Sequence, residues 1–167
     1  MKPQILYVDL DDTLCDYADG WSRAKKRFPQ NPYPQSQHGF FADLAPLPGA
    51  INSIKALHQN PFYDVYILTA PSVFNPMSYT EKRTWVGKHL GLEMAHRLII
   101  NPNKGLMRGD ILIDDSYGSH GQSQFEGEFI HFGSVQFPHW HAVMTYLNYT
   151  GFNGGNGRPN DAGHPRG

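Results

Sequence analysis

The chain has 167 residues, a net charge of −1 and a single cysteine. This length allows one domain to bury a core without disulfides or structural metals. Acidic and basic residues are balanced and intermixed, so no basic face favours duplex nucleic acid, and no apolar run reaches the roughly 20 residues of a membrane helix. Because a signal-peptide pattern is also absent, we expect a cytoplasmic protein that acts on a small molecule. The sequence leaves the oligomeric state open.

An apolar run over residues 5–8 leads directly into a group of acids. Asp9 and Asp11 follow the run, and Asp12 and Thr13 come next. Alternation along an extended chain places Asp9 and Asp11 on one side, about 7 Å apart. Two carboxylates in this arrangement can share a cation or divide the work of nucleophile and proton donor. Chemistry on a phosphate group is therefore the first functional hypothesis.

A helix and an irregular stretch follow this strand. Apolar residues recur at helical spacing from Tyr17 to Phe28, which predicts an amphipathic helix that ends at Pro29. From there to Pro48 the chain is rich in Pro, Gln and aromatic residues and has no clear periodicity. We expect residues 15–47 to form a small helical and irregular cap inserted after the first strand.

Helices and strands alternate in the rest of the chain. One helix should begin at Ser78, which forms the pattern of a capping box with Glu81, and should end at Gly91. Other helices are predicted after Gly49 and over residues 140–147. The predicted strands cover residues 65–68, 98–100, 111–113 and 128–132.

This alternation implies βαβ crossovers and hence a fold class. We predict an α/β fold with a doubly wound, mainly parallel sheet and helices on both faces. Residues 1–147 should form this single domain. From about Asn148 the chain becomes Gly-rich and polar, which predicts a disordered tail over residues 148–167.

Polar residues follow the predicted strands where each strand ends. They are Asp9, Thr69, Lys104, Asp114 and Asp115. The carboxyl ends of parallel strands share one edge of the sheet, where ligands bind, so we expect these side chains to meet. Together they supply a carboxylate nucleophile, a hydroxyl donor, a cation and paired acids. Such a set can cleave a phosphate ester.

The order of these residues resembles the four motifs of the haloacid-dehalogenase-like phosphohydrolases. Further segments are similar to the 5'(3')-deoxyribonucleotidase family, and the resemblance covers residues 4–147. The segments that carry it are FFADLAPLPGA at residues 40–50, ILTAP at 67–71, YTEKRTWV at 79–86 and LIDD at 112–115. Four motifs in the right order are a much stronger signal than any one of them.

The resemblance implies a Rossmann-like core and Mg²⁺-dependent hydrolysis of (deoxy)nucleoside monophosphates. Asp9 would attack phosphorus and form an aspartyl-phosphate, and Asp11 would protonate the leaving oxygen and later activate water. The implied phosphate-binding residues are Thr69, Ala70 and Lys104. The implied Mg²⁺ ligands are Asp9, the backbone carbonyl of Asp11, and one carboxylate of the pair Asp114 and Asp115, with Asp115 favoured.

The predicted cap is shorter than the one typical of this family, which bears on the substrate. Tyr17, Phe40 and Phe41 are candidate surfaces for stacking a nucleobase, with packing in the core as the alternative interpretation. Base preference, deoxy against ribo, and 5' against 3' phosphate stay open. Spacing places His139 and His141 on different sides of a helix start, which argues against a second metal site there.

Three other functions fit parts of the pattern. A phosphatase for another small phosphate ester or for a nucleic-acid 3'-end would keep the chemistry and change the substrate. A phospho-receiver domain also uses aspartates, a Thr and a Lys on a doubly wound sheet, but its acidic pair follows the first strand and its lysine comes last. A catalytically silent nucleotide-binding module is the third alternative.

Overall fold

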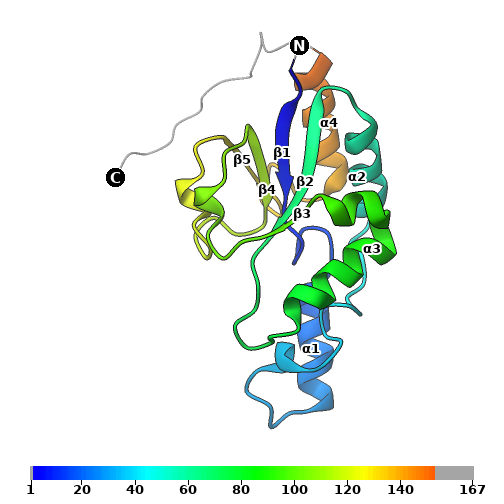
Figure 1. Ribbon diagram of the computed structural model, residues 1–167, viewed down its shortest axis with the longest axis vertical. Helices are drawn as coiled ribbons and strands as arrows, with labels where there is room; N and C mark the ends of the chain where they lie inside the picture. Colours follow the sequence, from blue (N-terminus) through cyan, green and yellow to red (C-terminus); the bar gives the residue numbers. More distant parts are fainter. Residues whose placement is uncertain (1, 153–167) are drawn as a thin grey trace.

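The computed structural model describes residues 2–152, and the rest of the predicted tail lies outside the described residues. Five parallel strands form one sheet in the order β3-β2-β1-β4-β5 (Figure 1). The predicted α/β fold class is therefore confirmed. The strands are β1 (Gln4–Val8), β2 (Tyr63–Thr69), β3 (Leu98–Ile100), β4 (Ile111–Asp114) and β5 (Glu128–His131).

Over the described residues, three α-helices and three short 3₁₀ helices lie between the strands, and a fourth α-helix follows the last strand. The α-helices are α1 (Tyr17–Arg27), α2 (Ala50–Gln59), α3 (Ser78–His96) and α4 (Trp140–Phe152), and the 3₁₀ helices are η1 (Pro34–Ser36), η2 (Lys104–Leu106) and η3 (Gln122–Gln124). Helix α4 continues past Leu147, where the sequence pattern predicted its end. Helix α3 continues past Gly91, which kinks it with a φ of 89°. None of the helices described combines the length and apolar character that a membrane crossing requires.

The two faces of the sheet are covered differently. Leu6 and Val8 of β1 face a large core built with α2, α3 and α4. Tyr7, between them in sequence, faces the opposite side and packs with Leu112 and Phe125 under the loops that contain η2 and η3. Helical segments thus cover both faces, but the α-helices outside residues 15–47, which are α2, α3 and α4, share one face. The connections from β3 to β4 and from β4 to β5 are short and rich in Gly, Asn and Ser, which do not support long helices.

The central position of β1 determines where the site forms. Val8 at its end pairs with Ile67 of β2 on one side and with Ile113 of β4 on the other. The backbone N–H of Asp9 continues this ladder and donates to the Ile113 carbonyl at 2.9 Å. Residues that directly follow β1 therefore lie between the ends of the two neighbouring strands.

The segment over residues 15–47 lies beyond the carboxyl ends of the strands, with α1 at its far end (Figure 1). Buried polar side chains of the main domain hold it in place. The indole Nε1 of Trp85 donates to the Leu44 carbonyl at 2.8 Å, and the Asn75 amide donates to the Gln35 carbonyl at 3.0 Å. We refer to residues 15–47 as the cap, and these hydrogen bonds attach it to the rest of the chain.

The capping box predicted at the start of α3 is wrong. No side chain caps this helix. The Glu81 carboxylate instead accepts hydrogen bonds from the backbone N–H groups of Gly39 at 2.8 Å and Phe41 at 3.1 Å, both in the cap. The Ser78 hydroxyl accepts from the backbone N–H of Ser72. Tertiary partners have replaced the local pairing that the spacing favours.

Candidate active site

A pocket of about 400 Å³ opens at the carboxyl edge of the sheet, beside the cap. Side chains from the turn after β1, from β2, α3, η2 and β4, and from the cap contribute to its walls. Nearly all the candidate residues named from the sequence line it: Asp9, Asp11, Tyr17, Phe41, Thr69, Ala70, Lys104, Asp114 and Asp115. The exception is Phe40, which is buried and borders a separate hollow on the cap.

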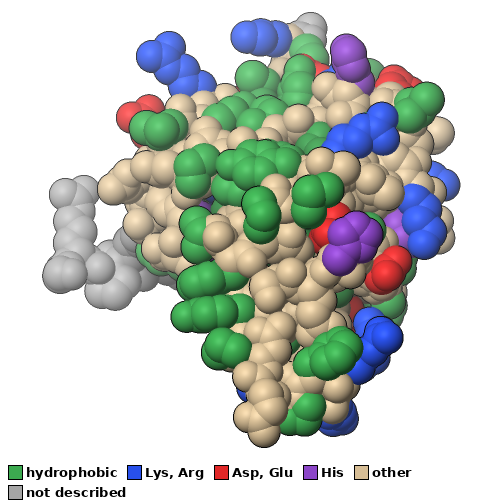
Figure 2. All heavy atoms as spheres, turned by 60° about the horizontal axis from the view of Figure 1, so that its bottom comes forward, with side chains coloured by type: hydrophobic (Ala, Val, Ile, Leu, Met, Phe, Trp, Pro, Cys, Tyr) green, Lys and Arg blue, Asp and Glu red, His purple; other side chains and the backbone are tan. Residues whose placement is uncertain are grey.

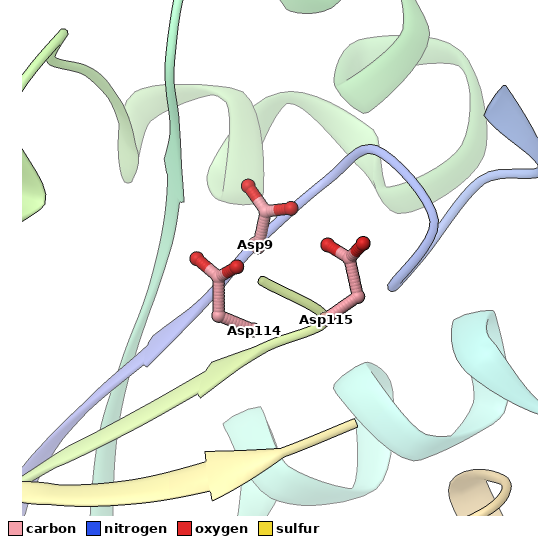
Figure 3. Close-up of side chains that lie close together, drawn as sticks. All are labelled: Asp9, Asp114 and Asp115. Carbon is pink, nitrogen blue, oxygen red and sulfur yellow. The ribbon is translucent and has the colours of Figure 1, made fainter. Parts of the chain in front are cut away.

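Three carboxylates form the acidic centre of the pocket. Asp9 directly follows β1, while Asp114 ends β4 and Asp115 follows it. One oxygen of each lies within 4.8 Å of the others. Figure 3 shows the three side chains reaching into the same space from the ends of two strands. Three like charges at this spacing repel one another, so the arrangement needs a positive partner.

Lys104 at the start of η2 supplies positive charge to this acidic trio. Its Nζ atom lies 2.5 Å from Asp9 Oδ1 and 2.5 Å from Asp114 Oδ2, and the residue is only 2% exposed. Burial lowers the pKa of Lys104, but Asp9 and Asp114 raise it by more, so the net shift is upward. Lys104 is therefore a charged ammonium group that bridges two of the three acids.

One lysine does not neutralise the whole trio. Burial, followed by the charge of Asp9, raises the pKa of Asp114 to about 6. Burial, followed by the charges of Asp9 and Asp114, raises the pKa of Asp115 to about 7. The ionised trio thus carries more negative charge than its surroundings balance. Carboxylate oxygens at this separation suit a hard divalent cation, so the trio can hold such an ion.

Asp11 has a different partner, Lys82, which sequence reasoning missed. The Lys82 ammonium donates to Asp11 Oδ2 at 2.7 Å, to Thr69 Oγ1 at 2.8 Å and to the Ala70 carbonyl at 2.7 Å. Burial raises the pKa of Asp11, and the charge of Lys82 opposes that rise without cancelling it. The two carboxylates of the first motif are therefore held by two different lysines.

A signal for Lys82 was present in the sequence. It lies three and four residues before Trp85 and Val86, the two most buried apolar residues of α3, and so on the same face of the helix. A lysine on such an apolar face needs a buried partner, because an unpaired charge there is costly. A search for charged residues on the apolar faces of predicted helices, in addition to the strand ends, would have identified Lys82.

Aromatic and apolar side chains form the wall of the pocket beside the cap. Tyr17 and Phe41 lie there with their ring centroids 6.1 Å apart, and burial, followed by Asp11 and Asp12, raises the pKa of Tyr17 to about 12. The loop after β2 adds Phe74, which stacks on Tyr33 of the cap at 4.1 Å between ring centroids. Apolar side chains are also spread over the outer face seen from the cap end (Figure 2).

Polar groups after β4 complete the rim. Ser116, Ser119 and His120 line the pocket, and the Ser119 hydroxyl lies 2.8 Å from Ser116 Oγ and 3.0 Å from His120 Nδ1. These residues were also missed, because a Gly- and Ser-rich loop has no periodic pattern that indicates its position. Within residues 2–152 the acidic trio is the one group of three or more possible metal ligands that meets in space, and His139 and His141 belong to no such group.

Comparison with known families agrees with this geometry. Residues 32–150 match the model of the family described as 5' nucleotidase, deoxy (pyrimidine), cytosolic type C protein. The chain belongs to this deoxyribonucleotidase family. Its members are phosphoric monoester hydrolases of the 5'-nucleotidase type. The resemblance inferred from the motifs is confirmed.

Relatives of this chain occur in viruses and in animals. A proposed 5'(3')-deoxyribonucleotidase of Vibrio phage KVP40 is 38% identical over 152 residues, which cover 87% of this chain and 85% of the relative. The cytosolic 5'(3')-deoxyribonucleotidase of Homo sapiens is 31% identical, over 70% of this chain and 73% of the human protein. The mitochondrial 5'(3')-deoxyribonucleotidase of Homo sapiens is 30% identical, over 65% of this chain and 60% of that protein.

The raised pKa of Asp115 predicts how stability depends on pH without metal. A carboxyl group whose pKa is higher in the folded than in the unfolded state binds more protons when folded, so its contribution to stability falls as the pH rises. For Asp115 the fall runs from about pH 4 to about pH 7. The variant Asp115→Asn lacks this contribution. Between pH 5 and pH 8, in EDTA, its free energy of unfolding should rise relative to wild type by on the order of 1 kcal/mol or more.

Urea unfolding followed by circular dichroism measures this difference. Thr84→Ala removes an exposed hydroxyl on α3 that donates to the Thr80 carbonyl and forms no hydrogen bond with a titrating group among the described residues, so its difference from wild type should stay constant over the same range. If the free energy of unfolding of Asp115→Asn relative to wild type stays constant or falls as the pH rises, the ionised carboxylate is not destabilised by its neighbours.

Proposed function

We propose that this chain is a Mg²⁺-dependent nucleotidase that hydrolyses (deoxy)nucleoside monophosphates through an aspartyl-phosphate on Asp9. The observation that supports it most is the acidic trio beside two buried lysines, in a pocket whose opposite wall is aromatic. Family membership adds the nucleotide as the substrate class. We also propose a cytoplasmic location, as in the name of the cytosolic human relative.

Two displacements at phosphorus make up the reaction. In the first, a carboxylate oxygen of Asp9 forms a bond to phosphorus as the bond to the sugar oxygen breaks, and Asp11 gives its proton to that oxygen. In the second, water attacks the aspartyl-phosphate, Asp11 takes a proton from the water, and the Asp9 carboxylate leaves. The raised pKa of Asp11 suits a group that must carry a proton and then accept one.

The acidic trio suits Mg²⁺ because its donors are all hard oxygens from carboxylates. Asp9, Asp114 and Asp115 would hold the ion. When bound, Mg²⁺ supplies positive charge that offsets the repulsion between an anionic nucleophile and an anionic substrate. The raised pKa values of Asp114 and Asp115 support this assignment, because they reflect negative charge for which a cation is the natural partner.

The phosphate would be held by Lys104, Thr69 and the backbone at Ala70. Lys104 has three N–H donors, and two have carboxylate partners among the described residues, which leaves one for a phosphate oxygen. The nucleobase would lie against Tyr17, Phe41 and Phe74, whose rings offer flat apolar surfaces. Phe40 packs edge-on against Tyr17 at 5.4 Å and would support that wall from behind.

Substitution of the two motif aspartates should separate their roles. With a deoxynucleoside monophosphate and Mg²⁺, Asp9→Asn should abolish phosphate release, because the amide is not a nucleophile. Asp11→Asn should lower kcat by about 10²–10⁴-fold, the typical contribution of general acid–base catalysis. Asp19→Asn, on the exposed side of α1, is the matched control and should retain wild-type activity. Undiminished activity in Asp9→Asn would end the covalent mechanism.

A substrate panel tests the assignment to nucleotides. Ribo- and deoxynucleoside 5'- and 3'-monophosphates should be hydrolysed with higher kcat/KM than sugar phosphates or 3'-phosphorylated oligonucleotides. Sugar phosphates have no base to stack on the aromatic wall, and an oligonucleotide brings further nucleotides that a pocket of about 400 Å³ does not hold. Phosphate release should stop in EDTA and return with Mg²⁺. Better turnover of the sugar phosphates or of the oligonucleotides would replace the proposed substrate class.

A further inference from the structure

We propose that Lys82 is a positioning residue that fixes the carboxylate of Asp11 and, together with Glu81, couples the cap to the reaction. This inference rests on the proposed function, in which Asp11 carries the proton. Lys82 lies at the start of the second turn of α3 and is the one residue of that helix among those that line the pocket.

The Lys82 ammonium has no donor left for a substrate. A lysine has three N–H donors, and here they reach Asp11 Oδ2, Thr69 Oγ1 and the Ala70 carbonyl at 2.7 to 2.8 Å. The side chain is 1% exposed. Lys104 differs, because only two of its donors have partners among the described residues. The two buried lysines therefore perform different tasks.

The remaining side of the Lys82 ammonium is covered by the cap. The ring centroid of Phe41 lies 4.8 Å from its Nζ atom, a distance typical of a cation–π contact. The backbone N–H of Phe41 donates to the Glu81 carboxylate at 3.1 Å. Glu81 and Lys82 are adjacent on α3, and both contact Phe41 of the cap. Lys82 also binds Asp11, the acid proposed to carry the proton.

Asp11 depends on this contact for its orientation. Its carboxylate has one other side-chain contact among the described residues, a weak one to Cys15 Sγ at 3.8 Å. Asp11 also lies outside β1, at an isolated bridge to Cys15 that leads into a turn at Asp12, whose φ is 53°. Without Lys82 the carboxylate can rotate away from the leaving oxygen, and small errors of position are costly in proton transfer.

Two substrates with different leaving groups can distinguish a role of Lys82 in positioning Asp11 from a role in binding phosphate. The sugar alkoxide of a nucleotide needs the proton from Asp11 when it departs, whereas the nitrophenolate of p-nitrophenyl phosphate leaves without one. The value of kcat/KM reports the half-reaction in which the leaving group departs. A defect confined to the proton donor should therefore affect the nucleotide and spare the aryl ester.

The experiment compares Lys82→Met with Lys88→Met, an exposed lysine on the same helix. Lys82→Met should lower kcat/KM for a deoxynucleoside monophosphate by about 10²-fold or more and for p-nitrophenyl phosphate by less than about tenfold. Lys88→Met should match wild type on both. Equal losses on the two substrates, or no loss, would overturn the proposal.

A second variant keeps the test decisive if Lys82→Met does not fold, as judged by circular dichroism. Glu81→Gln keeps the shape of the cap contact and weakens it, so it should show the same selective loss for the nucleotide in smaller measure. An equal effect on both esters would contradict the coupling. Asp9→Asn is measured alongside, because retained activity there would refute the proposed function, whereas a non-selective Lys82→Met refutes only this inference.

Discussion

The site depends on one electrostatic constraint, which is that parallel pairing of β1 with β4 brings three carboxylates to within 4.8 Å of one another. The register that pairs Val8 with Ile113 leaves no alternative position for Asp9. Burial of such a group is unfavourable unless positive charge is buried with it. Lys104 partly meets this need, and the remaining excess of negative charge supports the proposal that a cation binds at this edge of the sheet.

The start of α3 adds a second level of organisation. Its first two turns contain Glu81 and Lys82, both buried, and each binds a group on a segment far away in the sequence. Glu81 holds the cap and Lys82 holds the first motif. A substrate that enters beneath the cap therefore meets groups whose positions are already coupled, and little reorganisation is needed when the reaction begins.

The strand ends were well predicted from the sequence, because an apolar run followed by acids indicates where a buried strand stops. The carboxyl ends of parallel strands then share one edge of the sheet. Asp9 and Asp114 were placed together for this reason. Lys82 was missed because its position on the apolar face of α3 indicates a buried lysine but not its partners, which lie far away in the sequence after β1 and at the end of β2. Glu81 was assigned to a capping box, which its spacing favours, but the cap offers two backbone N–H groups that the spacing does not show. Phe40 illustrates the same limit, since adjacent aromatic residues give no sign of which one faces the pocket.

The stereochemical course at phosphorus tests the central claim, that a carboxylate oxygen of Asp9 accepts the phosphoryl group. A nucleoside phosphorothioate made chiral at phosphorus with one heavy oxygen isotope can be hydrolysed in water labelled with the other, and the configuration of the released thiophosphate, whose sulfur makes it chiral, determined. Two successive in-line displacements predict retention of configuration. Inversion would show that water attacks the substrate directly and that Asp9 is not the nucleophile.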